Sequence, residues 1–225
     1  MMRWIAMTLT LTAAVTMLPA CAESTSGNET EAAAAATDDT NEAAASGDLA
    51  TAVFAGGCFW CVEQAFDEVE GVVETTSGYT GGDVENPSYE QVTYNDTGHL
   101  EAVQVRYDPS VVTYETLLES FWHNVDPTDD RGQFCDKGHS YLSAIFVVDD
   151  EQRRLAEASR QALKDDADAP SPIVTPIREA RTFYAAEDYH QNYYEKKPVR
   201  YNFYKNACGR TARLEELWGD AAGKP

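Results

Sequence analysis

The sequence predicts an α+β domain built as a two-layer α/β sandwich. From about residue 50 onward, short runs of β-branched and aromatic residues alternate with segments of helical periodicity. The connections between these segments have mixed lengths, which favours a two-layer domain of this class. The chain has 225 residues, enough for one domain of ordinary size.

The first half of the domain begins with a buried strand followed by a helix. The run at 51–55 is apolar, and the two glycines after it allow a tight turn. Phe59 and three further apolar residues at helical spacing predict a helix that begins near Cys58. The elements expected next are a strand at 72–82 ending in a glycine turn, a loop or short helix at 86–92, a strand at 99–108 and an amphipathic helix at 113–125.

The second half continues with strands and helices and ends less regularly. The apolar run at 143–148 predicts a fully buried strand, and the acidic start of 150–164 suits a solvent-facing helix. Residues 173–179 predict an edge strand, because Pro176 cannot donate a hydrogen bond to a sheet. The last expected elements are a helix at 186–197 and an irregular C-terminal tail at 201–219 that ends in a short helix.

The N-terminus predicts an exported protein. Arg3 precedes a short apolar run that ends in LPAC at 18–21, a pattern typical of a secretory signal and too short for a transmembrane helix. The LPAC ending resembles a bacterial lipoprotein processing site, in which Cys21 carries the lipid. The alternative is a plain signal cleaved at the ACA of 20–22. We therefore expect a signal peptide at 1–21 and a periplasmic or cell-envelope protein, lipid-anchored at Cys21.

Residues 22–48 predict a disordered acidic tether ahead of a catalytic domain at 49–225. Ala, Ser, Thr, Asn and acids dominate the tether, which has no aromatic residue, Lys or Arg. This composition buries too little apolar surface to offset the entropy of ordering. The formal charge of the whole chain is −21, which argues against binding to nucleic acid or to anionic lipid.

The motif GGCFWCVE at 56–63 carries the first chemical signal. Cys58 follows a predicted strand and two glycines and stands where a helix should begin. Unpaired N–H groups and the helix dipole favour the thiolate there, and the thiolate is the nucleophilic form of cysteine. Cys61 lies one turn further into the helix, where this effect fades. The position in the motif therefore favours Cys58 over Cys61 as the nucleophilic thiol.

Three interpretations of the motif compete. A dithiol of the thioredoxin kind also starts a helix with two cysteines, although the Phe59–Trp60 insert would be unusual there. A zinc site would need a second close pair of Cys or His ligands, and the remaining cysteines and histidines form none. The third interpretation is a single nucleophilic thiol beside an apolar pocket. A general thiol–disulfide oxidoreductase that uses Cys58 and Cys61 is the alternative function.

The motif resembles the signature of the peptide-methionine (S)-S-oxide reductases, the methionine sulfoxide reductase A family. Further blocks match in order, so that the resemblance spans roughly residues 51–219. These blocks are TTSGYTGG at 75–82, NPSYEQV at 86–92, TGHLEAVQV at 97–105, FWHNVDPT at 121–128, GQFCDKGHSYLSAIF at 132–146, AEDYHQNYY at 186–194 and CGRTARLEELWG at 208–219.

The resemblance implies a ferredoxin-like plait with a mixed sheet and an enzyme that repairs oxidised proteins. Its substrates would be free methionine sulfoxide and oxidised proteins or peptides, and it would reduce the S epimer to methionine. The product on the enzyme would be a cysteine sulfenic acid, resolved as a disulfide and recycled by a thioredoxin-like reductant. The resemblance implies no cofactor and no metal. We expect a monomer that contacts a membrane only through its lipid anchor.

The resemblance also assigns roles to residues. Cys58 falls on the nucleophile, and Phe59 and Trp60 fall where the substrate's S-methyl group is held. Glu101 falls on the acid that protonates the sulfoxide oxygen. A sulfoxide sulfur is a poor electrophile until its oxygen is protonated, and a partly apolar site that raises a carboxyl pKa can supply that proton.

Three further positions complete the implied site. Tyr89 and Tyr141 fall on the two hydroxyls that bind the sulfoxide oxygen, and Asp136 falls on a polar residue that supports the site. One departure from the family pattern is Leu142, which stands where the family usually has an arginine. The loss of that guanidinium could alter turnover or the charge state of Asp136.

The resolving thiol has three candidates among the remaining cysteines. Cys208 falls near the family's resolving cysteine, in a Gly-containing tail, and we expect it to form the first disulfide with Cys58. Cys61 and Cys135 are the other candidates. A disulfide between Cys58 and Cys61 within one helical turn is awkward unless the first turn loosens.

Overall fold

The computed structural model describes residues 48–224. The predicted signal peptide at 1–21, with Cys21, and the tether up to residue 47 lie outside the described residues. A six-stranded sheet forms the centre of the domain, and its strand order is β7-β6-β1-β3-β2-β8. The strands are β1 (Ala50–Gly56), β2 (Val72–Thr80), β3 (Leu100–Tyr107), β6 (Ser143–Val147), β7 (Ile177–Glu179) and β8 (Tyr184–Ala185).

The sheet is mixed, as the sequence predicts. All its neighbouring strands pair antiparallel except β6 and β7, which are parallel. β7 lies at one edge, and Pro176 directly precedes it, so the prediction of an edge strand there is confirmed. The Pro176 carbonyl accepts a hydrogen bond from the Ile145 N–H at 3.0 Å.

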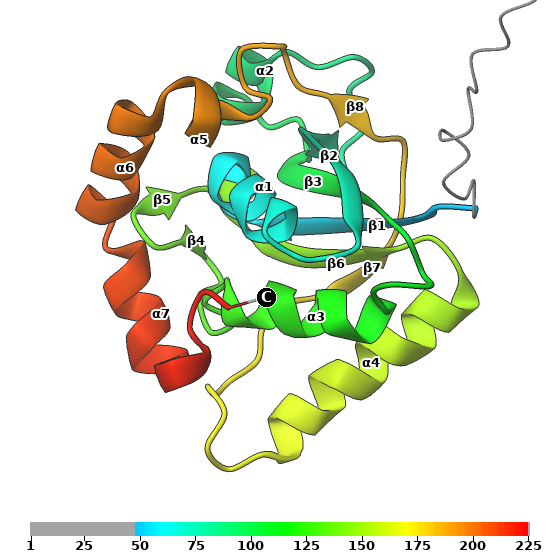
Figure 1. The fold of residues 1–225 in the computed structure, drawn as a ribbon. Helices are drawn as coiled ribbons and strands as arrows, with labels where there is room; N and C mark the ends of the chain where they lie inside the picture. The colour runs from blue at the N-terminus through cyan, green and yellow to red at the C-terminus, as the bar shows by residue number, and fades with distance from the viewer. Residues whose placement is uncertain (1–47, 225) are drawn as a thin grey trace, which may run out of the picture. The chain divides into compact units, whose positions relative to one another are not determined.

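The helices and short elements surround this sheet in Figure 1. Within residues 48–224, none of the helices has both the length and the apolar character that crossing a membrane requires. The helices are α1 (Phe59–Asp67), α2 (Tyr89–Tyr94), α3 (Tyr114–His123), α4 (Asp150–Asp165), α5 (Tyr193–Lys196), α6 (Pro198–Ala207) and α7 (Arg210–Trp218). The remaining elements are the hairpin strands β4 (Gly132–Gln133) and β5 (Asp136–Lys137) and the 3₁₀ turns His139–Tyr141 and Gly219–Ala221.

Local sequence signals explain where the long helices begin. The Thr113 hydroxyl accepts a hydrogen bond from the Thr116 N–H at 3.2 Å and caps α3. The Asp149 carboxylate accepts one from the Gln152 N–H at 2.7 Å and caps α4. Two further acids in the first turn of α4 complement the positive end of its dipole. Both helices therefore start at the residues that satisfy their free N–H groups.

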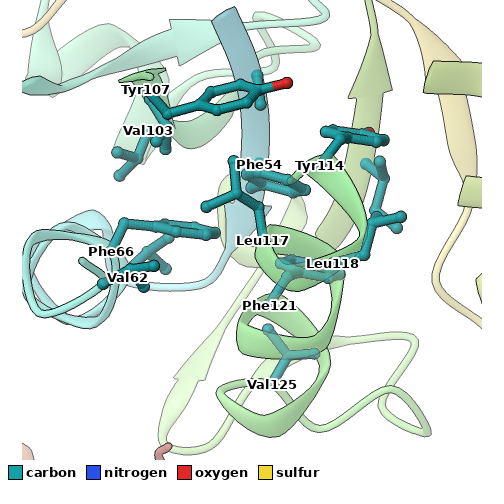
Figure 2. Packing of buried hydrophobic residues seen from close by; sticks show 14 of the residues in the cluster. Phe54, Val62, Phe66, Val103, Tyr107, Tyr114, Leu117, Leu118, Phe121 and Val125 are labelled. Carbon is teal, nitrogen blue, oxygen red and sulfur yellow. The ribbon is translucent and has the colours of Figure 1, made fainter. Parts of the chain in front are cut away.

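The main core lies between the sheet and helices α1 and α3, as Figure 2 shows. Phe54 projects from the middle of β1 and is fully buried. Its ring centroid lies 4.8 Å from that of Phe66 on α1 and 5.2 Å from that of Phe121 on α3. Three aromatic rings from three elements thus meet at one point and fix how both helices pack on the sheet.

The opposite face of the sheet carries a smaller apolar cluster. It consists of alternate residues of β1, β3 and β6, including Val53, Ala102 and Phe146, and connecting segments cover it through Leu142 and Phe183. The side-chain period of two in a strand explains this division of β1 and β3 between two cores. The same alternation gives Glu101 the face that α1 covers, which matters for the site below.

The C-terminal part is more regular than the sequence predicts at 201–219, and less helical at 186–192. Residues 188–192 form turns, and there the Gln191 side chain pairs with the Ser77 backbone N–H and carbonyl, both at 2.9 Å. The tail instead begins with α6, which Pro198 opens at its first position. Tyr201 of α6 is buried against the cysteine pair of the motif. The helical conformation of α6 therefore depends on contacts with the rest of the fold.

We predict that Phe54→Ala lowers the free energy of unfolding by about 3–5 kcal/mol, because it leaves a cavity where three rings meet. Urea unfolding followed by circular dichroism measures the change. Val73→Ala, at a position that is 59% exposed, is the control and should change it by less than about 0.5 kcal/mol. Equal small losses in both variants would show that the Phe54 site is not the centre of the core.

Candidate active site

The site is built on the junction between β1 and α1. Gly57 joins them with a φ of +82°, and a Cβ placed there would lie 2.5 Å from the Gln133 side chain. Cys58 follows, and its carbonyl accepts hydrogen bonds from the N–H groups of Cys61 at 3.1 Å and Val62 at 3.4 Å. The predicted start of a helix near Cys58 is confirmed.

A cavity of about 220 Å³ opens at Cys58. Seven of the residues predicted from the sequence line it together, although they come from five separate segments of the chain. The complete lining is Cys58, Phe59, Trp60, Tyr89, Glu101, Asp136, Tyr141, Arg200 and Tyr204. The eighth predicted residue, Cys208, is absent from this lining.

Glu101 lies at the base of the first turn of α1. It projects from β3, is 2% exposed, and its carboxylate accepts a hydrogen bond from the Phe59 N–H at 3.0 Å. Burial raises the pKa of this carboxyl to about 8, although the Phe59 hydrogen bond opposes the rise and the charge of Asp136 adds to it. Glu101 therefore holds a proton at neutral pH and can donate it into the cavity.

The two predicted phenols reach the cavity from different elements. Tyr89 begins α2, and its N–H donates to the Glu187 carboxylate at 2.9 Å. Tyr141 ends the 3₁₀ turn after β5. Burial, and next the charge of Glu101, raises the pKa of both hydroxyls, so both stay protonated at neutral pH and can donate hydrogen bonds.

Aromatic residues form one wall of the cavity. Phe59 is buried, and Trp60 stacks on Tyr193 with ring centroids 3.8 Å apart. The Trp60 indole N–H donates to His190 Nδ1 at 3.1 Å. The His190 ring also packs against Phe59 at 4.9 Å and against Tyr89 at 4.5 Å. Contacts from the 186–193 segment thus fix the orientation of both predicted pocket aromatics.

A hydrogen bond joins the thiols of Cys58 and Cys61 and shifts their pKa values in opposite directions. Burial raises the pKa of Cys58, and a hydrogen bond with Cys61 raises it further. That hydrogen bond lowers the pKa of Cys61 to about 6, against the effect of burial and with help from the Arg210 guanidinium. The hydrogen bond therefore favours loss of one proton from the pair, and Cys58 as the nucleophilic thiol stays a prediction.

Cys208 is bonded to Cys135 in a disulfide with a Cα–Cα distance of 5.0 Å. Cys208 follows the last residue of α6, while Cys135 lies in the turn between β4 and β5. Among the described residues, Cys58 and Cys61 are the free cysteines. Bonding of Cys208 to Cys58 stays a prediction, and it requires that the disulfide with Cys135 first be reduced.

Asp136 has a different support from the one that the family pattern suggests. The Tyr204 hydroxyl on α6 donates to its carboxylate, and burial raises the Asp136 pKa. Leu142 meanwhile packs on the apolar cluster of the opposite sheet face. The change from arginine to leucine therefore supplies an apolar contact, and a tyrosine of α6 holds the carboxylate.

Sequence reasoning missed the contributions of the C-terminal segment. Arg200 and Tyr204 line the cavity, and Glu187 and His190 position its side chains. Arg210 is 3% exposed, donates to the backbone carbonyls of residues 56 and 124, and lies over the Phe134 ring at 4.5 Å. The only signal for these residues was that two blocks of the resemblance, AEDYHQNYY and CGRTARLEELWG, contain several of them.

Comparisons with known proteins identify the family of this chain. The family model described as "Peptide methionine sulfoxide reductase" matches residues 50–222. The chain is 52% identical to the peptide methionine sulfoxide reductase MsrA of Bacillus pumilus over 169 residues, which are 75% of this chain and 95% of that one. It is 47% identical to MsrA 2 of Staphylococcus aureus, over 75% and 96% of the two chains.

A solved structure gives the same result for the fold. Methionine sulfoxide reductase A of Corynebacterium diphtheriae matches with a TM-score of 0.60 and 32% identity. The match covers 68% of this chain and 77% of that one. The α+β class with a mixed sheet is therefore confirmed.

We predict that Glu101→Gln changes how stability depends on pH. The folded pKa lies above the unfolded value of about 4.5, so the folded state binds more protons between pH 4.5 and about 8, and the wild-type protein loses stability as pH rises through this window. Glutamine does not titrate, so the variant does not lose this stability. The change in the free energy of unfolding caused by Glu101→Gln should therefore be more favourable at pH 9 than at pH 4 by on the order of 4 kcal/mol.

Urea unfolding at a series of pH values measures this difference. Glu74→Gln, at a half-exposed surface carboxylate, is the matched control and should follow the wild-type curve. A Glu101→Gln curve that runs parallel to the wild-type curve would refute the raised pKa.

Proposed function

This chain belongs to the peptide methionine sulfoxide reductase family, and we propose that it reduces the S epimer of methionine sulfoxide by attack of Cys58 on the sulfoxide sulfur. The observation that carries this proposal is the convergence of a cysteine, a protonated carboxyl and two phenols on one cavity with an aromatic wall. Both free methionine sulfoxide and oxidised polypeptides are proposed substrates, so that the enzyme repairs oxidised proteins.

Glu101 activates the sulfoxide in this proposal. Its proton, kept at neutral pH by burial, passes to the sulfoxide oxygen as the sulfur is attacked. The hydroxyls of Tyr89 and Tyr141 donate hydrogen bonds to the same oxygen, because both phenols are protonated and line the cavity. Fixed donors in a buried site stabilise the developing negative charge without reorganising water.

The reaction transfers the oxygen to the enzyme. The Cys58 sulfur bonds to the substrate sulfur while its own proton passes to the neighbouring Cys61 thiolate. Breakdown of this adduct releases methionine and leaves the oxygen on Cys58 as a sulfenic acid. The sulfoxide sulfur is reduced by two electrons, and the Cys58 sulfur is oxidised by two.

A second thiol then attacks the sulfenic acid, forms a disulfide and releases water. Two routes fit the cysteines described. In the state shown, Cys61 is the free thiol beside Cys58. When the Cys135–Cys208 disulfide is reduced, Cys208 becomes the resolving thiol that the family resemblance implies, because its sulfur lies 4.0 Å from an oxygen of Asp136 at the cavity wall.

We also propose export, lipid anchoring at Cys21, a tether at 22–48 and recycling by a thioredoxin-like protein. The sequence pattern of residues 1–21 supports export. An exported protein enters an oxidising compartment. A catalytic thiol in such a compartment needs a protein that supplies electrons.

We predict that Cys58→Ser abolishes methionine formation, whereas Cys61→Ser still releases one methionine per enzyme in a single turnover. The rate of Cys61→Ser should fall, because the thiolate that accepts the Cys58 proton is gone. Quenched mixing of reduced enzyme with excess sulfoxide, without added reductant, measures both the yield and the rate. Loss of product in both variants would favour a dithiol mechanism.

We predict reduction of the S epimer and not of the R epimer. With the methyl group against Phe59 and Trp60 and the oxygen on Glu101 and the two phenols, only one hand aligns the sulfur with Cys58. Separate progress curves on the resolved epimers, with a small dithiol as reductant, test this. Comparable rates on both epimers would contradict the proposed arrangement.

We predict that the resolving cysteine depends on the redox state of the Cys135–Cys208 disulfide. After one turnover of enzyme in which this disulfide is intact, mass mapping should find Cys58 bonded to Cys61. After full reduction, mass mapping of the wild-type protein should find Cys58 bonded to Cys208, and Cys208→Ser should release one methionine but recycle more slowly, through a bond between Cys58 and Cys61. Normal recycling of fully reduced Cys208→Ser would assign the resolving role to Cys61 alone.

A further inference from the structure

The stretch at 196–213, which runs from the end of α5 through α6 into α7, concentrates positive charge. The chain's formal charge is −21, yet six of its 17 Lys and Arg residues lie at 196–213, a stretch without any acid. Figure 1 shows α5, α6 and α7 along one side of the domain, next to the β4–β5 hairpin. An acidic protein thus presents a local basic surface on one side.

Three of these cations are solvent-exposed and available to bind a ligand. Lys196, Lys197 and Arg200 are exposed, and none of them forms an ion pair with a carboxylate within residues 48–224. Lys196 donates only to the Asp188 backbone carbonyl, at 3.0 Å. Their charges are not balanced locally, which favours an anionic partner.

Apolar side chains project between these cations. Val199 is 85% exposed and Phe203 is 76% exposed, and Val199 is the most exposed of the large apolar residues in the described part of the chain. The two residues are four apart on α6 and therefore lie on one stripe of the helix. Large apolar side chains with this much solvent exposure are typical of a binding surface.

The neighbouring stripe of the same helix lines the active-site cavity. Arg200 and Tyr204 follow Val199 and Phe203 by one residue each, and both line the cavity that holds Cys58. Several links hold α6 in place: the Tyr204–Asp136 hydrogen bond, hydrogen bonds from Tyr201 and Lys205 to Gln64 of α1, and the Cys135–Cys208 disulfide at its C-terminal end. The exposed stripe is therefore a fixed surface that continues from the rim of the cavity.

We propose that the α6 surface, defined as Lys196, Lys197, Val199, Arg200 and Phe203, binds the polypeptide that flanks an oxidised methionine and prefers acidic and apolar neighbours. The inference rests on the proposed function, because it takes the cavity as the sulfoxide site. A methionine sulfoxide side chain in the cavity brings its own backbone to the rim, where the adjacent residues meet α6. Free methionine sulfoxide ends at the rim and gains nothing from this surface.

Peptide kinetics test the proposal. Three substrates are compared with a small dithiol as reductant: free methionine sulfoxide, a peptide with Asp and Phe beside the sulfoxide, and the same peptide with Lys in place of Asp. We expect the acidic peptide to have a kcat/KM about tenfold above that of the lysine peptide at low salt, with a smaller gap at high salt.

Paired variants locate the effect. Val199→Ser with Phe203→Ser should lower kcat/KM about tenfold for the acidic peptide and leave free methionine sulfoxide unchanged. Val73→Ser with Val111→Ser, at other exposed valines, is the matched control and should change neither substrate.

A charge variant tests the electrostatic part separately. Lys197→Glu should remove the preference for the acidic peptide, whereas Lys164→Glu on α4 should keep it. Unchanged peptide kinetics in the α6 variants would overturn the proposal. A loss of activity in the α6 variants that appears only when a protein reductant replaces the small dithiol would also overturn it, because α6 would then bind the reductant. A change in oligomeric state in these variants would overturn it as well, because α6 would then be a contact between copies of the chain.

The test separates this proposal from the one on which it rests. If the wild-type protein fails to reduce free methionine sulfoxide, the proposed function fails. If it reduces free methionine sulfoxide but treats all peptides and α6 variants alike, the proposed function stands and the α6 surface is rejected.

Discussion

The hydrogen bond from the Phe59 N–H to the Glu101 carboxylate is the contact on which the rest of the site depends. It joins the first turn of α1 to the middle of the sheet, at a point from which water is excluded. One consequence is geometric, because the same turn carries Cys58 and the aromatic wall. The other is electrostatic and comes from burial, because removing the carboxyl from water raises the Glu101 pKa although the hydrogen bond itself opposes the rise. Position of the nucleophile and protonation of the acid thus follow from one local arrangement.

This arrangement requires support from distant parts of the chain. The stacked rings around Phe54 fix α1 and α3 on the sheet, which sets where the first turn of α1 lies. The segment after β8 then surrounds the site: Glu187 holds the start of α2, His190 orients Trp60, and Tyr204 reaches Asp136. Each of these polar contacts joins residues far apart in sequence, so the site forms only in the completed fold. The packed core on one side and these hydrogen bonds on the other together determine the shape of the cavity.

The sequence predicted the central elements because their patterns are local. Helix α1 follows from the spacing of its apolar residues, and the buried strands follow from their apolar runs. Glu101 is different, because on an alternating strand it would be expected to face water, and only the family resemblance marked it. The turns at 188–192 and helix α6 could not be predicted, because their conformations depend on contacts with Ser77 and the cysteine pair. The bond between Cys135 and Cys208 spans 73 residues, a separation at which pairing follows from the fold alone.

Catalysis as proposed here requires that burial keeps Glu101 protonated at neutral pH. The most direct measurement is a pH titration of the Glu101 side-chain carboxyl by 13C NMR, in reduced protein labelled at glutamate, with Glu101→Gln to assign the signal. We expect a single transition near pH 8, the pKa to which burial raises this carboxyl. A transition near 4.5, the ordinary value for an exposed glutamate, would contradict it, because Glu101 would then be ionised when substrate binds and could not supply the proton.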